Sequence, residues 1–437
     1  MSHIKEKLQN KTAVLGVIGL GYVGLPLAVE KAKAGFSTIG VDILQDRVDQ
    51  VNQGHNYIGD VVTADLEEIV RSGRLVATTD YAELAEADTI CLCVPTPLDK
   101  HQQPDTSCIE QSVKALLPYI HEDMLIVLES TTYPGCTEEL IKPMIEQTGL
   151  VCGRDIYLAF SPERVDPGND KFKTRNTPKV VGGVTQACTE VAAALYEAIL
   201  EAPIHRVSSP AVAEMEKILE NSYRNINIGL VNELAQLCHK MNINVWEVID
   251  TAATKPYGFQ AFYPGPGLGG HCIPLDPYYL SWKAREYGFH TSMIEASMMI
   301  NDGMPEYTAY RAIKILNRAQ ARAVNGSRIL ILGVAYKQDI SDVRESPALR
   351  VIDQLEERGA EVRFFDPYIL SYRDKRGMTR QGEVELTRDL VKWADLVVIT
   401  TAHTTVDYAF VQQYARNIFD TKNACKAVSD RDNIDLL

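Results

Sequence analysis

Paired cysteines are missing from the sequence. Its nine cysteines are dispersed, and no two of them form a Cys-x-x-Cys pair. This spacing supports neither a zinc ribbon nor a disulfide framework, and we expect no metal site. Cys91 and Cys93 stand two apart in an apolar run, so we expect them on one face of a buried strand. Reduced thiols are the rule in the cytoplasm, which is the location we expect.

A surplus of basic residues is also missing. Lys and Arg together number 44 against 58 Asp and Glu, which gives a net charge of -14. Nucleic acids and anionic membranes bind basic footprints, so the charge balance argues against both as general partners. A local basic pocket for a phosphorylated small molecule remains open. With 437 residues, 46% hydrophobic and 23% charged, the chain has the composition of a globular protein of two or three domains.

Long apolar runs are scarce. One uncharged run of 18 residues, 12 to 29, follows three lysines and is long enough for a signal peptide or a membrane helix. Four glycines and a proline interrupt it, and three of those glycines fall in a phosphate-loop pattern. We therefore expect no membrane insertion.

The pattern along the chain alternates strands and helices at both ends and is helical between them. Alternation of this kind indicates βαβ units and parallel sheets. The expected strands are 13–18, 37–41, 89–94, 125–128, 156–159, 180–184, 328–332, 362–365 and 396–400, with helices at 25–34 and 347–358. From about 210 to 320 helical stretches dominate, interrupted by a loop rich in glycine and proline at 263–272. The predicted domains are 1–209, 210–322 and 323–437.

A dinucleotide-binding loop is predicted near the N-terminus. Gly19, Gly21 and Gly24 fit G-x-G-x-x-G between a strand and a helix, where the helix N-terminus can hold a pyrophosphate. Asp42 ends the next strand, 23 residues after Gly19, and an acidic side chain there favours NAD over NADP. Arg47 qualifies this choice slightly, because a nearby arginine could accept a phosphate.

The segment 263–276 carries the candidate nucleophile. Four glycines and two prolines precede Cys272, so the backbone is shaped for close approach and the thiol can face a ligand. Asp276 follows by four residues, about one helical turn. The plain alternative is a free cysteine in a loop; a metal at His271 and Cys272 is disfavoured because no second ligand pair accompanies them.

A helix at 213–225 carries a third candidate group. Lys217, Asn221 and Arg224 have helical spacing and are expected on one face. A solvated charged face is the ordinary explanation, but asparagine is a poor helix former and its enrichment here makes a polar site plausible.

Over its full length the chain resembles the nucleotide-sugar 6-dehydrogenases, the UDP-glucose/GDP-mannose dehydrogenase family. The matching motifs occur in one order: Gly19 to Gly24, Cys93-Val-Pro-Thr-Pro, Glu129-Ser-Thr-Thr-Tyr-Pro, Ser161-Pro-Glu-Arg, Lys217 to Asn221, Gly265 to Asp276, Gly333-Val-Ala-Tyr-Lys and Arg344-Glu-Ser. The resemblance implies an α/β fold of two Rossmann-like, doubly wound domains joined by a long central helical region. It also implies a homodimer or higher homo-oligomer.

The resemblance further implies oxidation of a primary alcohol to a carboxylate with two NAD in succession. By this analogy Cys272 holds the aldehyde as a thiohemiacetal and then becomes a thioester that water hydrolyses, chemistry that suits a thiolate. Lys217 and Asn221 would stabilise oxyanions, Asp276 and Thr132 would order a water, and Glu163 would be the hydrolytic base.

The binding residues follow from the same matches. The cofactor would contact Gly19, Gly21, Tyr22, Val23, Gly24, Asp42, Arg47, Thr96, Thr132 and Arg344. The UDP-sugar would contact Glu163, Arg164, Lys217, Asn221, Tyr263, Gly267, Gly269, Tyr336 and Lys337.

One departure from the family bears on the sugar. Many relatives carry an arginine about 14 to 16 residues before the cysteine, whereas the segment Lys255 to Phe262 has none. This segment resembles the branch that acts on UDP-N-acetylhexosamines in surface polysaccharide and O-antigen synthesis. The expected substrate is UDP-N-acetyl-D-glucosamine, with UDP-N-acetylmannosamine, UDP-glucose and GDP-mannose as alternatives.

Two readings from other classes stay open. A short-chain dehydrogenase or epimerase would use Tyr-x-x-x-Lys, which occurs at Tyr310 and Lys314 but leaves Cys272 without a role. A sensor that binds nucleotide sugars without catalysis would form no product, although every matched position here holds a competent residue.

Overall fold

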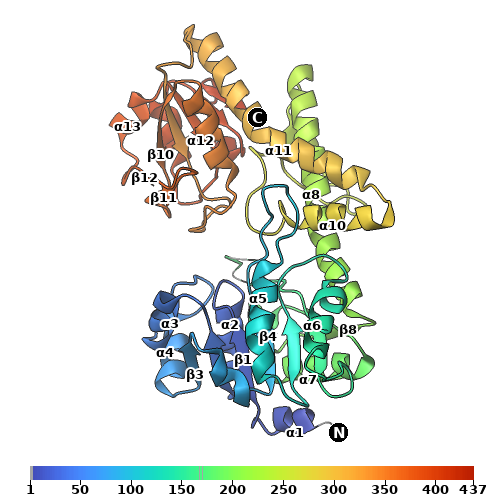
Figure 1. Cartoon of the computed structure of the whole chain (residues 1–437). Coiled ribbons are helices and arrows are strands. Elements are labelled where there is room, and N and C mark those ends of the chain that lie inside the picture. The colour runs from blue at the N-terminus through green and yellow to red at the C-terminus, as the bar shows by residue number, and fades with distance from the viewer. Residues whose placement is uncertain (1–2, 167, 170) are drawn as a thin grey trace. The chain divides into compact units, whose positions relative to one another are not determined.

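The computed structural model describes residues 3–166, 168–169 and 171–437, which form two compact units. Unit 1 comprises residues 1–220 and 278–289, and unit 2 comprises residues 221–277 and 290–437 (Figure 1). Unit 1 carries the N-terminal glycine loop, and unit 2 carries Cys272.

Unit 1 is built on an eight-stranded sheet. Its order is β3-β2-β1-β4-β5-β6-β7-β8, and neighbouring strands are parallel except for the antiparallel pair β6–β7. The strands are β1 Val14–Ile18, β2 Ser37–Val41, β3 Leu75–Thr78, β4 Thr89–Leu92, β5 Leu125–Leu128, β6 Tyr157–Phe160, β7 Lys179–Gly183 and β8 Ile204–Val207. The order of the first six strands, 3-2-1-4-5-6, is that of the doubly wound dinucleotide-binding fold, which places ligands beside the carboxyl ends of β1 and β4.

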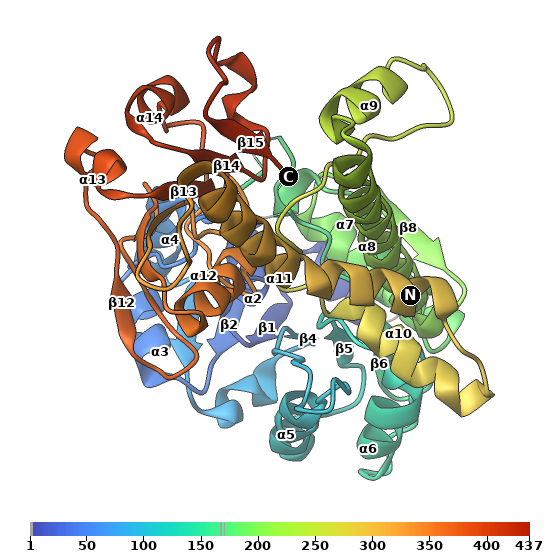
Figure 2. The same ribbon diagram turned by 90° about the horizontal axis from the view of Figure 1, so that it is seen from above.

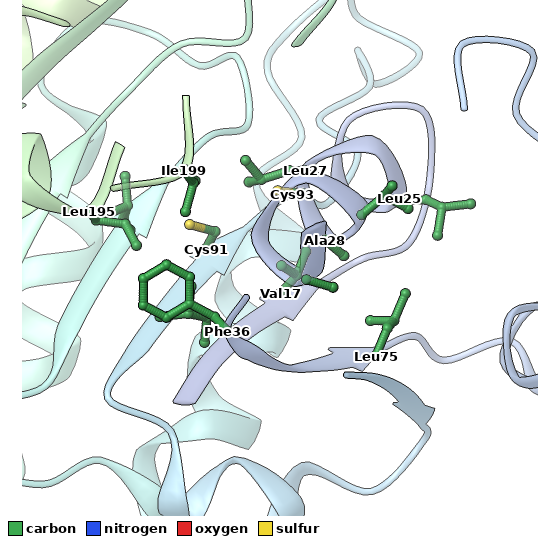
Figure 3. Packing of buried hydrophobic residues seen from close by; sticks show 14 of the residues in the cluster. Val17, Leu25, Leu27, Ala28, Phe36, Leu75, Cys91, Cys93, Leu195 and Ile199 are labelled. Carbon is green, nitrogen blue, oxygen red and sulfur yellow. The ribbon is translucent and has the colours of Figure 1, made fainter. Parts of the chain in front are cut away.

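Helices cover both faces of this sheet. The helices of the first part of the chain are α1 His3–Gln9, α2 Gly24–Lys33, α3 Gln45–Asn52, α4 Thr63–Arg71, α5 Ser107–Leu116, α6 Lys142–Glu146 and α7 Gln186–Ile199. One apolar cluster joins Val17 and Cys91 of the sheet to Leu27 of α2 and Leu195 of α7 (Figure 3). A second cluster packs α5 and α6 against the opposite face. Both Cys91 and Cys93 are buried, as predicted.

Unit 2 contains a five-stranded parallel sheet, in the order β10-β9-β13-β14-β15. Its strands are β9 Arg328–Leu332, β10 Glu361–Phe365, β13 Leu396–Ile399, β14 Ile418–Asp420 and β15 Ile434–Leu436, with a separate hairpin of β11 Ser371–Arg373 and β12 Thr379–Gln381. The helix α12 Pro347–Glu357 packs on one face, and α13 Arg388–Trp393 and α14 Tyr408–Tyr414 pack on the other. This is a second doubly wound domain of order 2-1-3-4-5.

Four further helices occupy the middle of the chain: α8 Pro210–Met241, α9 Val245–Ala252, α10 Asp276–Ala284 and α11 Ser292–Gln320 (Figure 2). The two long ones have 32 and 29 residues. Within the described ranges, no helix combines the length and the apolar character that crossing a membrane requires. The uncharged run 12–29 instead forms β1, the glycine loop and α2.

The predicted fold class is confirmed, two Rossmann-like domains with a central helical region. Most predicted strands are placed within one or two residues, and 37–41, 125–128 and 328–332 coincide with β2, β5 and β9. The strands β3, β8, β11, β12, β14 and β15 were not predicted. The predicted domain boundaries 1–209, 210–322 and 323–437 remain a prediction.

Candidate active site

The glycine loop of unit 1 is shaped by close backbone approaches. Gly19 has φ +92°, and its N–H donates to the Val41 carbonyl at 2.7 Å. A Cβ on Gly24 would lie 1.7 Å from the Gly19 oxygen, so no larger residue fits there. A Cβ on Gly21 would meet nothing within 4 Å. The loop therefore has open space beside its second glycine, where a pyrophosphate is expected to lie against the backbone.

Asp42 follows β2 and is 5% exposed. Its carboxylate accepts backbone N–H groups from Leu20 at 2.9 Å and Leu44 at 3.0 Å, and the Arg47 guanidinium lies 3.3 Å from the same side chain. The Tyr57 hydroxyl, which sequence reasoning missed, donates to the Leu20 carbonyl at 2.7 Å. The acidic residue is thus fixed beside the glycine loop, an arrangement that fits a ribose of a dinucleotide.

Two buried threonines lie in the loops after β4 and β5. The Thr96 hydroxyl donates to the Thr131 carbonyl at 2.6 Å, and the Tyr279 hydroxyl donates to the Thr96 carbonyl. The Thr132 hydroxyl is buried and has no hydrogen-bond partner in the part of the chain that the structure describes. An orphaned buried donor of this kind fits a bound ligand or water. Tyr22 at the glycine loop is exposed and Val23 is half-buried.

Glu163 lies in the loop after β6. Its Oε1 accepts backbone N–H groups from Arg164 at 2.8 Å and Val165 at 2.7 Å, and its carbonyl accepts the Lys217 ammonium at 2.6 Å. These contacts fix both the side chain and the backbone of the candidate base.

Arg164 turns away from Glu163 toward the helix α8. Its guanidinium pairs with Glu220 and lies 3.4 Å from Glu216. Burial and the neighbouring Glu220 carboxyl raise the pKa of Glu216 to about 7. A diphosphate could therefore bind the Arg164 guanidinium only by displacing the Glu216 and Glu220 carboxylates.

In unit 2 Cys272 stands at the start of a helical turn. Its carbonyl accepts N–H groups from Leu275 at 3.0 Å and Asp276 at 2.8 Å, so Asp276 lies one turn further along, where α10 begins. The Asn221 amide donates to the Asp276 carboxylate at 2.6 Å. Asp276 is 2% exposed, whereas the Cys272 side chain is half-buried. Asp276 and Asn221 thus form a hydrogen-bonded polar pair one helical turn after Cys272.

A ladder of buried amides holds both ends of the cysteine loop. Asn225 of α8 donates to the Ile273 carbonyl at 3.1 Å, and Asn232 accepts the Gly265 N–H at 3.0 Å. Asn301 of α11 bridges them: it donates to the Asn225 carbonyl at 3.0 Å and accepts from the Asn232 amide at 2.9 Å. Sequence reasoning missed Asn232 and Asn301. Arg224, which was predicted to share the face of Lys217 and Asn221, is exposed instead, because the buried face continues through Asn225.

The glycines of the cysteine loop pack against the C-terminal domain. A Cβ on Gly269 would lie 2.5 Å from Cβ of Tyr336, and the Gly270 N–H donates to the Arg344 carbonyl at 3.0 Å. Gly267 has φ +134°, a conformation that only glycine adopts readily. The loop therefore places Cys272 near the segment that carries Tyr336, Lys337 and Arg344 in sequence.

Three further side chains border this loop. Tyr263 stacks on Trp246 with ring centroids 5.6 Å apart and donates to Asp250 at 2.7 Å. The Arg344 guanidinium pairs with the Asp342 carboxylate at 2.7 Å. Lys422, which was not predicted, lies over Gly265, and burial lowers its pKa to about 8. Over the described ranges, no group of three or more His, Cys, Asp or Glu side chains could hold a metal ion.

The predicted residues divide between the two units. Unit 1 holds Gly19, Gly21, Tyr22, Val23, Gly24, Asp42, Arg47, Thr96, Thr132, Glu163, Arg164 and Lys217; unit 2 holds Asn221, Tyr263, Gly267, Gly269, Cys272, Asp276, Tyr336, Lys337 and Arg344. Lys217 and Asn221, which are expected to share a role, both lie on α8 but fall in different units.

Comparison with known proteins decides the family. Residues 13–200 match the NAD binding domain of the UDP-glucose/GDP-mannose dehydrogenase family, residues 211–303 match its central domain and residues 330–427 match its UDP binding domain. The chain belongs to the UDP-glucose/GDP-mannose dehydrogenase family. It is an oxidoreductase, an NAD-dependent UDP-sugar dehydrogenase, and the predicted recognition, enzyme class and cofactor are confirmed.

Individual members of this family show how the sugar can vary. Protein CapL from Staphylococcus aureus is 38% identical, with 80% of each chain covered. The UDP-N-acetyl-D-glucosamine 6-dehydrogenase from Pseudomonas aeruginosa is 36% identical over 82% of this chain and 84% of its own. The solved structure of a UDP-D-ManNAc dehydrogenase from Pyrococcus horikoshii superposes with a TM-score of 0.85 at 32% identity, covering 94% of this chain and 96% of that one.

The glycine loop of this dehydrogenase gives a first prediction. Gly24→Ala forces a Cβ into the Gly19 backbone. We therefore expect the free energy of unfolding to fall by about 3 kcal/mol, the upper end of the cost of overpacking. Gly21→Ala meets open space, so we expect a change in unfolding free energy within about 0.5 kcal/mol but a loss of NAD affinity. Denaturant unfolding and NAD titration measure the two effects. NAD affinity that is unchanged in a folded Gly21→Ala variant would contradict the placement of the pyrophosphate.

The thiols give a second prediction. Cys272 and Cys108 are half-buried and the other seven cysteines are buried. Burial raises the pKa of Cys136, Cys152 and Cys425 to about 12, so few reactive thiolates form there. Brief alkylation of the folded dehydrogenase, read by mass spectrometry, should label Cys272 and Cys108 alone. Equal labelling of a third cysteine in folded protein would show that the burial pattern is wrong.

Proposed function

We propose that this dehydrogenase oxidises the C6 hydroxyl of UDP-N-acetyl-D-glucosamine to the carboxylate, supplying a uronic acid precursor for surface polysaccharide or O-antigen. The observation that carries the reaction is Cys272 one turn before Asp276, whose carboxylate accepts from Asn221. The sugar is supported by the segment 255–262, which lacks an arginine, and by the relative from Pseudomonas aeruginosa named for this substrate.

NAD would be held by the glycine loop, by Asp42 and by the threonines Thr96 and Thr132, with Arg344 as a further contact. Bound NAD supplies a hydride acceptor, and two used in succession remove the four electrons that separate an alcohol from a carboxylate. The fixed Asp42 carboxylate favours two ribose hydroxyls over a phosphate. Because Arg47 already pairs with Asp42, it does not offer an unoccupied cation for NADP.

Cys272 would act as a covalent catalyst. Its thiolate adds to the aldehyde carbon to form a thiohemiacetal, which keeps the intermediate on the enzyme and sets it up for a second oxidation to a thioester. Asn221 and Lys217 would donate to the oxygen as negative charge develops on it. Asp276 would orient a water or carry a proton beside the thiol.

Glu163 would activate the water that hydrolyses the thioester. Two backbone N–H groups hold Oε1, so Oε2 would be the oxygen that accepts the proton. Thr132, whose buried hydroxyl has no partner among the described residues, would help to order the cofactor or that water.

The UDP-sugar would lie against the cysteine loop and the C-terminal domain. Glu163 and Arg164 would line the sugar side, Gly267 and Gly269 would offer backbone, and Tyr263, Tyr336 and Lys337 would provide rings and a cation for the nucleotide. A cation beside a diphosphate forms charge-assisted hydrogen bonds. UDP-N-acetylmannosamine is the second candidate substrate, favoured by the structure from Pyrococcus horikoshii.

A stoichiometry assay tests this function. UDP-N-acetylglucosamine, UDP-N-acetylmannosamine, UDP-glucose and GDP-mannose are supplied in parallel, and NADH formed per sugar consumed is counted. We expect two NADH per UDP-N-acetylglucosamine and, for Cys272→Ala, a loss of at least about 100-fold in turnover. One NADH per sugar would contradict the proposed thioester intermediate. Two NADH with a preference for another sugar would agree with the mechanism but contradict UDP-N-acetylglucosamine as the substrate.

We also propose that two copies of the chain pair through α8. This helix exposes an apolar stripe at helical spacing, formed by Leu219, Tyr223, Leu230, Leu234, Leu237 and Met241. A continuous apolar face on an exposed helix is typical of a subunit interface. A second copy of the same helix satisfies it because an isologous interface uses one patch on both subunits. The cytoplasm is the proposed location, since none of the nine cysteines, all of them among the described residues, forms a disulfide.

The stripe gives a prediction about assembly. Leu230→Glu combined with Leu237→Glu places charges in the apolar face, so the dimer should dissociate to the 48.6 kDa chain. His239→Glu adds the same side chain to the exposed helix outside the stripe and should leave the dimer intact. Sedimentation measures both. A wild-type protein that sediments as a single chain would contradict the proposal.

A further inference from the structure

A buried ion pair lies beside the Glu163 loop and has no part in the mechanism described above. Glu129 directly follows β5 and Lys179 begins β7; they are 1% and 4% exposed, and Tyr196 of α7 beside them is fully buried. Taking two charges out of water costs free energy that their attraction only partly returns. A pair in this position therefore calls for a role beyond stability.

The three side chains contact one another. The Lys179 ammonium donates to Glu129 Oε2 at 2.6 Å, the Tyr196 hydroxyl donates to Glu129 Oε1, and the ammonium lies 5.0 Å from the Tyr196 ring centroid. Burial raises the pKa of Tyr196 well above its usual value, so the phenol keeps its proton. Burial alone would lower the pKa of Lys179, but the Glu129 and Glu163 carboxylates outweigh it and raise that pKa.

Lys179 reaches from this set to the candidate base. Its ammonium donates to the Pro162 carbonyl at 3.3 Å and lies 3.7 Å from Glu163 Oε2. Since Oε1 of Glu163 is already bound by two backbone N–H groups, Oε2 is the oxygen that faces the cation. The Glu163 side chain is 18% exposed, so the same carboxylate borders solvent.

We infer that Lys179, anchored by Glu129 and Tyr196, is a positioning residue for hydrolysis of the Cys272 thioester. It fixes the loop that carries Glu163 and sets a cation beside the working oxygen. The inference rests on the proposed role of Glu163 as base. In that step water adds to the thioester carbon, its proton passes to Glu163, and the carbon–sulfur bond breaks to release the Cys272 thiolate and the carboxylic acid. No electrons are exchanged in this step.

The Glu163 loop is thus held from two sides. Lys179 binds it through the Pro162 carbonyl, and Lys217 binds it through the Glu163 carbonyl at 2.6 Å. A shift of about 1 Å in a catalytic group can cost about 100-fold in rate. Loss of Lys179 should therefore slow hydrolysis, in which Glu163 acts as the base, far more than the two oxidation steps, in which Glu163 only lines the sugar side.

The test separates these steps in the full-length enzyme. The double variant Glu129→Gln with Lys179→Met removes both buried charges together, which avoids leaving one of them unpaired. We expect a rapid burst of two NADH per active site, then turnover slowed about 10- to 100-fold, with the acyl group retained on Cys272 in quenched samples by mass spectrometry. An equal slowing of burst and steady state, or wild-type hydrolysis, would overturn the inference.

Two further variants complete the experiment. Tyr196→Phe removes a single oxygen and keeps both charges, so it should fold and show the same burst with a smaller slowing of hydrolysis; slowed oxidation without a burst would count against the inference. Lys283→Met is the matched control, because Lys283 is also buried, pairs with two carboxylates and lies 5.2 Å from the Tyr133 ring. It should give no burst, and a burst there would show that loss of any buried lysine has this effect.

Glu163→Gln separates the inference from the proposed function. If Glu163 is the base, this variant shows the burst and the trapped acyl group, whatever Lys179 does. A burst in Glu163→Gln with wild-type hydrolysis in the double variant would overturn the inference alone. Wild-type hydrolysis in Glu163→Gln would overturn the proposed role of the base, and the inference with it.

Discussion

The arrangement of this enzyme depends on one constraint: parallel strands bring their carboxyl ends to the same edge of a sheet. In unit 1 the glycine loop follows β1, Asp42 follows β2, Thr96 lies beyond β4, and Glu129 and Glu163 follow β5 and β6. Residues more than a hundred positions apart thereby meet in one row of loops. The strand β7 is the exception: it runs antiparallel to β6, so its first residue, Lys179, lies at this edge and faces Glu163.

The C-terminal domain repeats this backbone arrangement with a different loop. The Gly19 N–H donates to Val41 at 2.7 Å, and the Gly333 N–H donates to Phe365 at 2.9 Å. Asp42 accepts the Leu20 N–H at 2.9 Å, and Asp366 accepts the Val334 N–H at 2.7 Å. In both sheets an aspartate after the second strand fixes the turn after the first. Asp366 also contacts the buried His403 ring at 3.0 Å, so its carboxylate is occupied by protein.

Strong local signals explain what could be predicted from the sequence. Apolar β-branched runs such as 125–128 have to be buried strands, and G-x-G-x-x-G marks a turn that tolerates no Cβ at Gly24. The short strands β14 and β15 carry too few residues for a pattern of their own. Lys179, Tyr196 and Asn301 could not be assigned roles, because their meaning depends on partners that are distant in sequence: 50 positions for Lys179, 67 for Tyr196 and 69 for Asn301. The strands of the fold can thus be predicted from local sequence patterns. The residues that hold the site in place cannot, because their hydrogen-bond partners are distant in sequence.

Helix α8 shows how the chain combines these demands. An ordinary helix buries an apolar stripe and exposes a polar one. Here the buried side carries Lys217, Asn221, Asn225 and Asn232, while leucines at 219, 230 and 237 are exposed. These four have partners: Lys217 binds the Glu163 carbonyl, Asn221 binds Asp276, and the other two hold the cysteine loop. The buried side of α8 thus combines apolar packing residues such as Ile218 and Val231 with the polar side chains of the candidate site, and its exposed side carries the apolar stripe.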